Sequence, residues 1–393
     1  MKILFIWLLI TMTHSYAQEF SFLHYNIKEL DSLKILKNSE QVKAVKNILN
    51  ENNFDFLSLN EIHYDSPNIP NNLIKTQGQN LSQLIKLFEL PHNYSSFHPA
   101  LTGNNALKKE DGSYYSDPNS TEARNNADQI NFGIMPAQYS TGLISKFKIL
   151  EEKLINLKWK DFNPSVDLSK FKLANGNPVP EDILLFDKTF SDITISINEK
   201  KLHLVLLHAV TAFGFGNKNT MNFARNADQL KFLEWYLTGK TSFEVSLSNI
   251  NPLKENTHYL AAGDFNVDIK EAQKEGARVL KNLINKTKSW LPLQNLTHTY
   301  ESDSLAPDPF RLNLDYILVS KNIKVLEGKI LHPNYHRIEL GTEKPEVNLN
   351  KNQELISYLD NNKTNYAIVT KNYTNFKKAS DHFPIWGRFQ LLD

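Results

Sequence analysis

The stretch AAGDFNVD, residues 261–268, ends an apolar run that begins at Tyr259. Its alanines precede a single glycine, Asp264 follows that glycine, and Asn266 comes two positions later. The apolar approach predicts a buried strand that ends here. An Asp after a glycine is often only a turn former. A strand that merely filled a core would not need a carboxylate and an amide so close together, so the stretch favours a functional strand end.

Other apolar segments of the chain end in the same way, with a polar residue of a chemically useful type. These residues are Asn26, Glu61, His208, Asp315, and the pair Asp381 and His382. Binding and catalytic groups gather at strand ends because a rigid scaffold fixes the side chain while its tip stays accessible. A lone histidine there is more often structural, but the repeated pattern predicts that these side chains form one site.

The order of predicted elements indicates an α/β protein, because strands and helices alternate along the chain. Strands are expected at residues 20–27, 54–59, 141–149, 192–197, 202–207 and 312–319, and helices at 40–49, 81–90, 222–237 and 272–284. No Pro-, Gly- or Ser-rich linker interrupts this pattern, so residues 18–393 are expected to form a single domain. Residues 103–126 are predicted to be a long loop, and segments near 151–190 and 340–372 are predicted to be insertions.

The chain has 393 residues, a formal net charge of +1 and no cysteine. The balanced charge gives no global basic field of the kind that marks many nucleic-acid binders. The absence of cysteine excludes a thiol nucleophile and thiolate metal sites, which leaves oxygen and imidazole as metal ligands.

The N-terminus predicts export. Lys2 precedes the apolar run ILFIWLLITM, and Ser15 and Ala17 are small residues at the positions that a signal peptidase recognises. Residues 1–17 are therefore expected to be a signal peptide and the protein to be secreted or periplasmic. The apolar run is too short to span a bilayer, so no transmembrane segment is expected.

Seven motifs in order resemble the endonuclease/exonuclease/phosphatase superfamily, the deoxyribonuclease-I-like fold, along nearly the whole mature chain. They are HYNI with Asn26, NEI with Glu61, GLISKF at 142–147, LLH with His208, GDFN with Asp264 and Asn266, LDYI with Asp315, and SDHFPI with Asp381 and His382. The resemblance implies a four-layer α/β sandwich, in which two packed mixed β-sheets are flanked by helices. It also implies a metal-dependent phosphoesterase.

The resemblance assigns a role to each strand-end residue. It implies that Glu61 is the main metal ligand, with Asp381 and Asn26 as further ligands. Mg²⁺ is the expected metal, with Mn²⁺ or Ca²⁺ as alternatives, since oxygen ligands suit hard cations.

The remaining strand-end residues act on water and phosphate in the roles that the resemblance implies. Asp264 orients or deprotonates the attacking water, and Asn266 contacts a phosphate oxygen or a second metal. His382 lies against the phosphate, and Asp315 accepts the proton of its other ring nitrogen, which fixes the tautomer and favours the imidazolium. His208 is a second phosphate contact or a proton donor.

Three further residues are candidates for binding the substrate. Arg124 and Arg225 occur in the similar segments EARNNADQI (122–130) and FARNADQL (223–230), and an arginine can hold a phosphate through two parallel hydrogen bonds. Tyr139 is expected to replace the phosphate-contacting tyrosine of the nuclease branches that the resemblance points to.

Three functions remain open from the sequence. The first is a phosphodiesterase that cleaves nucleic acid. The second is a phosphoesterase acting on a lipid headgroup or a small ester, which the phenylalanines of HAVTAFGFGNKN (208–219) would suit because they can contact a lipid or stack on a base. The third is an inactive binding protein on the same fold. A monomer is expected in each case.

Overall fold

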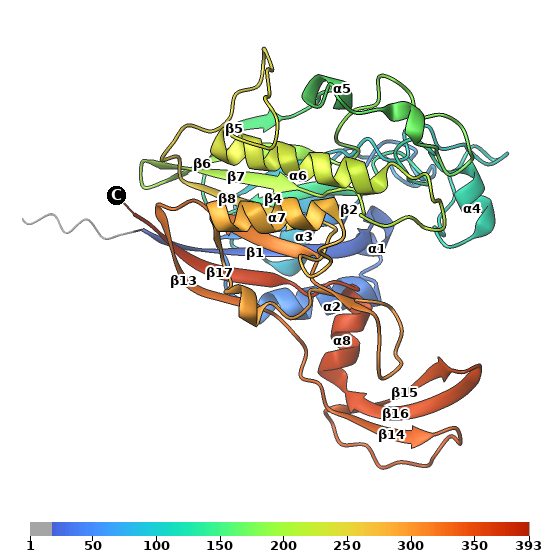
Figure 1. Cartoon of the computed structure of the whole chain (residues 1–393). Helices are drawn as coiled ribbons and strands as arrows, with labels where there is room; N and C mark the ends of the chain where they lie inside the picture. The colour runs from blue at the N-terminus through green and yellow to red at the C-terminus, as the bar shows by residue number, and fades with distance from the viewer. Residues whose placement is uncertain (1–17, 393) are drawn as a thin grey trace, which may run out of the picture.

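The computed structural model describes residues 18–392, which form two six-stranded mixed sheets packed face to face between layers of helices (Figure 1). This architecture confirms the predicted four-layer α/β sandwich. The predicted signal peptide, residues 1–17, lies outside the described residues.

The first sheet has the strand order β13–β17–β1–β2–β4–β3. Its strands, in chain order, are β1 (Glu19–Leu30), β2 (Phe56–Ile62), β3 (Tyr94–His98), β4 (Ser140–Ser145), β13 (Ile323–Ile330) and β17 (Ile385–Leu391). Only β1 and β2 run parallel to each other, and the helices between them supply the crossover.

The second sheet has the strand order β5–β6–β7–β8–β12–β9. Its strands are β5 (Ile149–Leu154), β6 (Phe190–Ile197), β7 (Lys200–Leu207), β8 (Tyr259–Asp264), β9 (Lys288–Ser289) and β12 (Asp315–Val319). Again one pair, β7 and β8, is parallel. Five of the predicted site residues lie near or just beyond the carboxyl ends of these two parallel pairs: Asn26, Glu61, His208, Asp264 and Asn266.

Eight α-helices flank the sheets or lie in the loops of the described chain. They are α1 (Ser32–Leu36), α2 (Glu40–Asn50), α3 (Asn80–Phe88), α4 (Thr121–Asn126), α5 (Trp159–Phe162), α6 (Asn222–Thr238), α7 (Glu275–Lys286) and α8 (Lys371–Ala379). Apolar side chains of α6 and α7 pack against the second sheet, and those of α2, α3 and α8 pack against the first.

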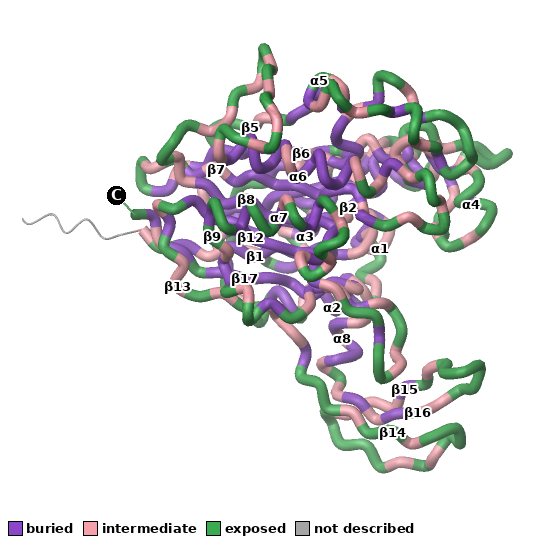
Figure 2. Tube along the Cα trace, in the orientation of Figure 1, coloured by how far each residue is buried: buried purple, intermediate pink, exposed green. Residues whose placement is uncertain are grey.

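The core arises from strands that are buried on both faces. In β1, Phe20 and Phe22 point toward the second sheet, whereas Leu23, Tyr25 and Ile27 point toward the helices. Such a strand reads as a nearly continuous apolar run rather than an alternating one. Figure 2 shows the sheets as the buried centre of the molecule and the connecting loops as its exposed periphery.

The segment between β5 and β6 was predicted to be an insertion, and it contributes directly to the core. Trp159 and Phe162 of α5 are buried in the main apolar cluster. The indole nitrogen of Trp159 donates a hydrogen bond of 2.7 Å to Asp228 on α6. The segment therefore covers the second sheet, which explains why its sequence lacks the composition of a surface loop.

The region predicted as a surface insertion near 340–372 contains a separate three-stranded sheet that projects from the body (Figure 1). Its strands are β14 (Arg337–Gly341), β15 (Gln353–Asp360) and β16 (Lys363–Thr370), and a short pair, β10 (Tyr300–Glu301) and β11 (Arg311–Leu312), lies near its base. The buried carboxylate of Glu301 accepts hydrogen bonds from Tyr335 and Tyr373 and so ties this region to the body.

No helix among the described residues is long and apolar enough to cross a membrane. This agrees with the sequence-based expectation for that part of the chain.

The close approach of β7 and β8 depends on Gly263. Its φ is +154°, and a Cβ added there would lie 1.6 Å from the carbonyl oxygen of Leu207. We expect Gly263→Ala to destabilise the fold by more than about 2 kcal/mol, because the backbone of a central strand must move. Chemical denaturation measures this loss. Gly112→Ala is the control, since Gly112 also has a positive φ but no atom within 4 Å. Equal losses in the two variants would contradict the steric argument.

Candidate active site

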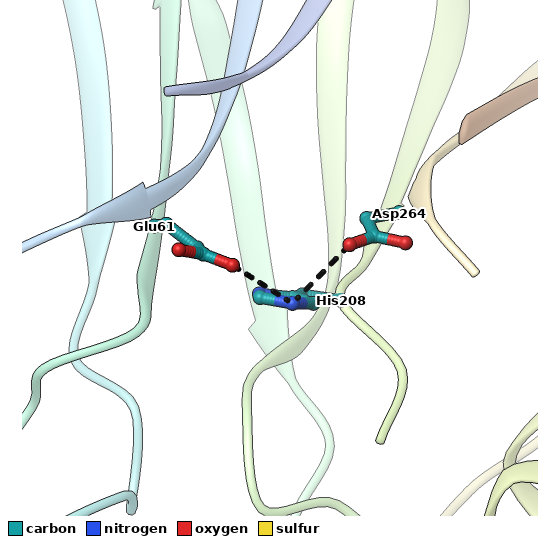
Figure 3. A group of neighbouring side chains, drawn as sticks. All are labelled: Glu61, His208 and Asp264. Atoms are coloured by element: carbon teal, nitrogen blue, oxygen red, sulfur yellow. Dashed lines mark ion pairs between the residues drawn. The ribbon is translucent and has the colours of Figure 1, made fainter. Parts of the chain in front are cut away.

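Three side chains from two sheets converge at one end of the sandwich. Glu61 lies near the end of β2, His208 follows β7, and Asp264 ends β8 (Figure 3). The Nε2 atom of His208 lies 3.6 Å from Asp264 Oδ2 and 3.9 Å from Glu61 Oε1. These separations leave the imidazole between two carboxylates without a direct hydrogen bond to either.

Asp264 is held in place by amide groups. Its Oδ1 accepts a hydrogen bond of 2.8 Å from the backbone N–H of Asn266, and its Oδ2 accepts from the side-chain amides of Asn266 and Asn26 at 3.0 and 3.1 Å. Asn26 also donates to Glu61 at 3.1 Å. The carboxylates of Glu61 and Asp264 are therefore linked through the amide of Asn26, which belongs to the first sheet, as Glu61 does.

A second carboxylate–imidazole group adjoins the first. His382 Nδ1 lies 2.8 Å from Asp315 Oδ2, and Thr299 Oγ1 donates to the same oxygen at 2.6 Å. The other ring nitrogen of His382 points back to Asp264, with 3.8 Å between Nε2 and Oδ2. Asp315 thus directs the free edge of His382 toward Asp264.

Burial makes two acidic side chains of the site, Glu61 and Asp264, hold their protons unusually tightly. Desolvation, with repulsion from Glu29 and Asp381, raises the pKa of Glu61 to about 7. Desolvation, partly offset by His382, raises the pKa of Asp264 to about 8. Neighbouring carboxylates that repel each other in a buried site form a favourable environment for a cation.

The two histidines of the site are in opposite charge states near neutral pH. Desolvation and the nearby Lys188 hold the pKa of His208 well below its ordinary value, so its imidazole is neutral. Desolvation also acts on His382, but attraction to Asp315 and Asp264 outweighs it and raises the pKa to about 10. The site therefore presents one neutral imidazole and one imidazolium to the same space.

The donor groups fit a divalent cation. Glu61, His208 and Asp264 each offer one ligand atom, and these atoms lie within 4.8 Å of one another, as do those of Asp264, Asp315 and His382. Because Asp315 already binds His382 and Thr299, the first group is the better candidate. Asp381 is half-buried, and its charge acts on Glu61, which places it beside this group.

Two predicted contacts differ in the orientation of their amides. Asn26 was expected to offer an oxygen to the metal, but its Oδ1 accepts from the backbone N–H of Lys28 and its nitrogen faces the carboxylates. Asn266 was expected to contact a phosphate oxygen or a second metal, but its Nδ2 donates to the carbonyl of Ala209 and to the carboxylate of Asp264. In this structure both amides orient carboxylates instead.

Tyr139 and Arg124 lie at the edge of the site. The hydroxyl of Tyr139 donates to Glu29 at 3.1 Å, and burial together with Glu29 and Glu61 keeps its pKa well above 10. Arg124 is exposed on α4, and its charge acts on the Tyr139 hydroxyl. Contact of Tyr139 and Arg124 with the substrate stays a prediction, and their position at the edge of the site is compatible with it.

Arg225 does not fit the expected role in substrate binding. It is 1% exposed, and its guanidinium donates to the carbonyls of Leu184 and Leu185 and to Asn131. All of these partners belong to loops that pack on α6. Arg225 therefore fastens these loops to the helix through its Nε and Nη2 atoms.

The structure adds residues that the sequence did not single out. Asn60 accepts the backbone N–H of Asp264 at 2.9 Å, Thr299 supports Asp315, and the buried Lys188 lies 3.3 Å from the carbonyl of Ala209. Asn60 interrupts an apolar strand next to Glu61, so the sequence could have indicated that it belongs to the site. Thr299 and Lys188 lie in irregular segments, where no sequence pattern indicates a role in the site.

The fold and the site together define a hydrolase of phosphate esters built on an α/β sandwich. Residues 23–382 match the model of the Endonuclease/Exonuclease/phosphatase family, and the chain belongs to that family. Its members act on phosphate ester bonds. No individually curated protein matches the chain significantly.

Solved structures share the fold at low sequence identity. An endonuclease/exonuclease/phosphatase from Beutenbergia cavernae has a TM-score of 0.51 and 11% identity, over 95% of this chain and 72% of that one. D. rerio TDP2 with a single strand DNA product has a TM-score of 0.46 and 15% identity, over 94% and 98%. Sphingomyelinase C from Streptomyces griseocarneus has a TM-score of 0.45 and 15% identity, over 94% and 99%.

Cation binding is expected to depend on Glu61 and on pH. Protons compete with the cation because the pKa values of Glu61 and Asp264 are raised to about 7 and about 8, so affinity should increase between pH 6 and pH 8. Glu61→Gln should weaken Mn²⁺ binding at pH 8 by at least about tenfold. Isothermal titration calorimetry of metal-free protein measures both effects.

The matched control for this substitution is Glu40→Gln at the exposed start of α2, which should bind Mn²⁺ as the wild type does. Unchanged affinity in Glu61→Gln, or affinity that is independent of pH, would show that the cation binds elsewhere.

Proposed function

We propose that this protein is a secreted, divalent-metal-dependent phosphodiesterase that cleaves nucleic acid. The observation that supports this most directly is the arrangement of Asp264 between a neutral His208 and a protonated His382. One acceptor for a proton and two imidazoles in different charge states suit hydrolysis of a phosphate ester by water. Mg²⁺ is the proposed metal and a monomer the proposed state.

Each residue has a separate role in the proposed reaction. Asp264 takes a proton from the attacking water, whose oxygen bonds to phosphorus as the bond to the leaving oxygen breaks. The imidazolium of His382 binds a phosphoryl oxygen. With the cation held by Glu61 and Asp381, His208 keeps its ring proton and donates a hydrogen bond to the leaving oxygen, which takes up a proton from solvent. Bound at Glu61, the cation would supply further neutralisation of phosphoryl charge.

One exposed cation at the rim suits a polyanionic substrate. Arg124 is exposed beside Tyr139, whereas the buried Lys188 behind His208 is paired with Asp187 at 3.3 Å. A nucleic-acid strand carries one phosphate per nucleotide, so a neighbouring phosphate can contact Arg124 while another is cleaved. Secretion is proposed because the sequence of residues 1–17 has the pattern of a signal peptide.

An alternative substrate is a lipid headgroup or small ester, and one observation favours it. Phe213 and Phe215 are 53% and 69% exposed and contact each other edge to face, with 5.0 Å between ring centroids. They lie in the loop that follows His208. Exposed aromatic rings next to a site suit a lipid surface, although they can also stack on bases.

We expect His382→Ala to lower kcat on the preferred substrate by about 10²- to 10⁴-fold, because it removes the protonated donor at the phosphoryl group. The assay compares plasmid DNA, RNA, sphingomyelin and bis-p-nitrophenyl phosphate with Mg²⁺ and with chelator. His258→Ala is a control, since His258 is half-buried and its ring bonds the carbonyl of Leu392 rather than a residue of the site. A folded His382→Ala variant with the wild-type rate would refute the assignment.

The same assay separates the two substrate classes. Chelator-sensitive cleavage of plasmid supports the nuclease. Activity confined to sphingomyelin, and lost in a Phe213→Ser/Phe215→Ser double variant, supports the lipid alternative. A folded, cation-binding protein that cleaves none of the substrates would favour the inactive binding protein.

A further inference from the structure

A third histidine lies behind the Asp315–His382 pair. His24 is fully buried in β1, two residues before Asn26 and on the same face of the first sheet. Its Nε2 lies 3.3 Å from Asp315 Oδ1, across the interface between the sheets. Asp315 is therefore flanked by two imidazoles, one on each carboxylate oxygen.

The partners of these atoms make the contact specific. Asp315 Oδ2 is bound by His382 and Thr299, whereas Oδ1 forms no hydrogen bond among the described residues. The Nε2 atom of His24 also forms none, so the 3.3 Å between Nε2 and Oδ1 is a close polar contact without the alignment of a hydrogen bond. Both atoms are buried, and an unpaired buried polar atom costs about 1–3 kcal/mol, so each has a strong reason to face the other.

The hydroxyl of Ser58 is placed to select the tautomer of His24. Its Oγ lies 3.2 Å from His24 Nδ1, opposite it in the register of β1 and β2. When the hydroxyl donates to Nδ1, the ring proton resides on Nε2, the nitrogen that faces Asp315 Oδ1 at 3.3 Å. The contact requires only a neutral imidazole and does not depend on the charge of His24.

We propose that His24 is a positioning residue that holds Asp315, and through it His382, in the orientation needed for reaction. Thr299 and His382 hold Oδ2 of the Asp315 carboxylate, and the buried His24 ring, with Nε2 3.3 Å from Oδ1, opposes rotation of the carboxylate on its other side. His382 Nδ1 then keeps a fixed acceptor, and Nε2 stays directed at Asp264. His24 touches neither cation nor substrate, and its effect on catalysis rests on the proposed function.

The test compares His24→Leu with His24→Gln. Leucine removes the donor, whereas the glutamine amide places an N–H at about the same distance from the backbone. Outer partners of catalytic imidazoles change activity by about 10- to 100-fold, so His24→Leu should lower kcat by at least about tenfold with little change in KM. His24→Gln should recover most of the loss.

His203 provides a matched control elsewhere in the second sheet. Its Nδ1 lies 2.9 Å from Asp192, which also accepts a hydrogen bond from Tyr236, so the pair resembles Asp315 with His382 and Thr299. His203→Leu should lower the melting temperature without changing kcat. If His24→Leu lost activity only in proportion to its stability, as His203→Leu does, the proposal would be overturned.

Proton NMR tests the geometry without turnover. The Nδ1 proton of His382, assigned by its absence in His382→Gln, should move upfield in His24→Leu because the Asp315 carboxylate is no longer fixed. An unchanged resonance would overturn the proposal even if activity fell. If the wild type hydrolysed no phosphate ester, the proposed function would fail, while this measurement would still decide the role of His24.

A variant at Ser58 covers the case in which His24→Leu does not fold. Ser58→Ala leaves both histidines in place but removes the group that fixes the tautomer. It should shift the His382 proton in the same direction and lower kcat by a smaller factor. Wild-type values for both quantities would overturn the proposal.

Discussion

The hydrogen bonds that join the two sheets at one end are the constraint on which the site depends. Asn60 and Asn26 of the first sheet bind Asp264 of the second, and His24 faces Asp315 in the same layer. Below this layer the interface is apolar and includes Phe20, Phe22 and Phe56. Apolar packing brings the sheets together without fixing their register closely, whereas these directional contacts position one strand end against another.

Burial gives the polar layer its chemical properties. In water, carboxyl groups such as those of Glu61 and Asp264 would lose their protons well below neutral pH. Between the sheets, desolvation raises the pKa of both, and the same low dielectric strengthens the attraction between Asp315 and His382. The same environment therefore makes the carboxylate of Asp264 a stronger base and keeps the imidazole of His382 protonated. The different charge states of His208 and His382 follow from their surroundings. Burial and Lys188 keep His208 neutral, whereas Asp315 and Asp264 keep His382 protonated.

The sequence predicted the ends of β2, β7 and β8 because burial and function leave separate marks there, and an apolar run followed by Asp264, Glu61 or His208 is visible without any structure. The prediction was wrong for Asp315, which begins β12, and for Asp381 and His382, which precede β17. The alternation of elements predicted an α/β protein, and the family resemblance of the motifs implied the four-layer sandwich. Side-chain direction was less accessible. Arg225 looked like Arg124 in sequence, yet one is buried in hydrogen bonds and the other exposed. That difference depends on loops around Leu184 and Asn131, whose paths local sequence patterns do not determine.

The polar residues inside the strands carried information that the strand ends did not. His24 and Ser58 interrupt runs of apolar residues in β1 and β2, and they pair across the register that the parallel strands impose. A buried polar residue in a central strand needs a partner, since leaving it unpaired costs more than one hydrogen bond contributes. Here the partner of His24 belongs to the opposite sheet and comes about 290 positions later in the chain. Predicting it requires the way the sheets stack, which is why the support of the site appears only in three dimensions.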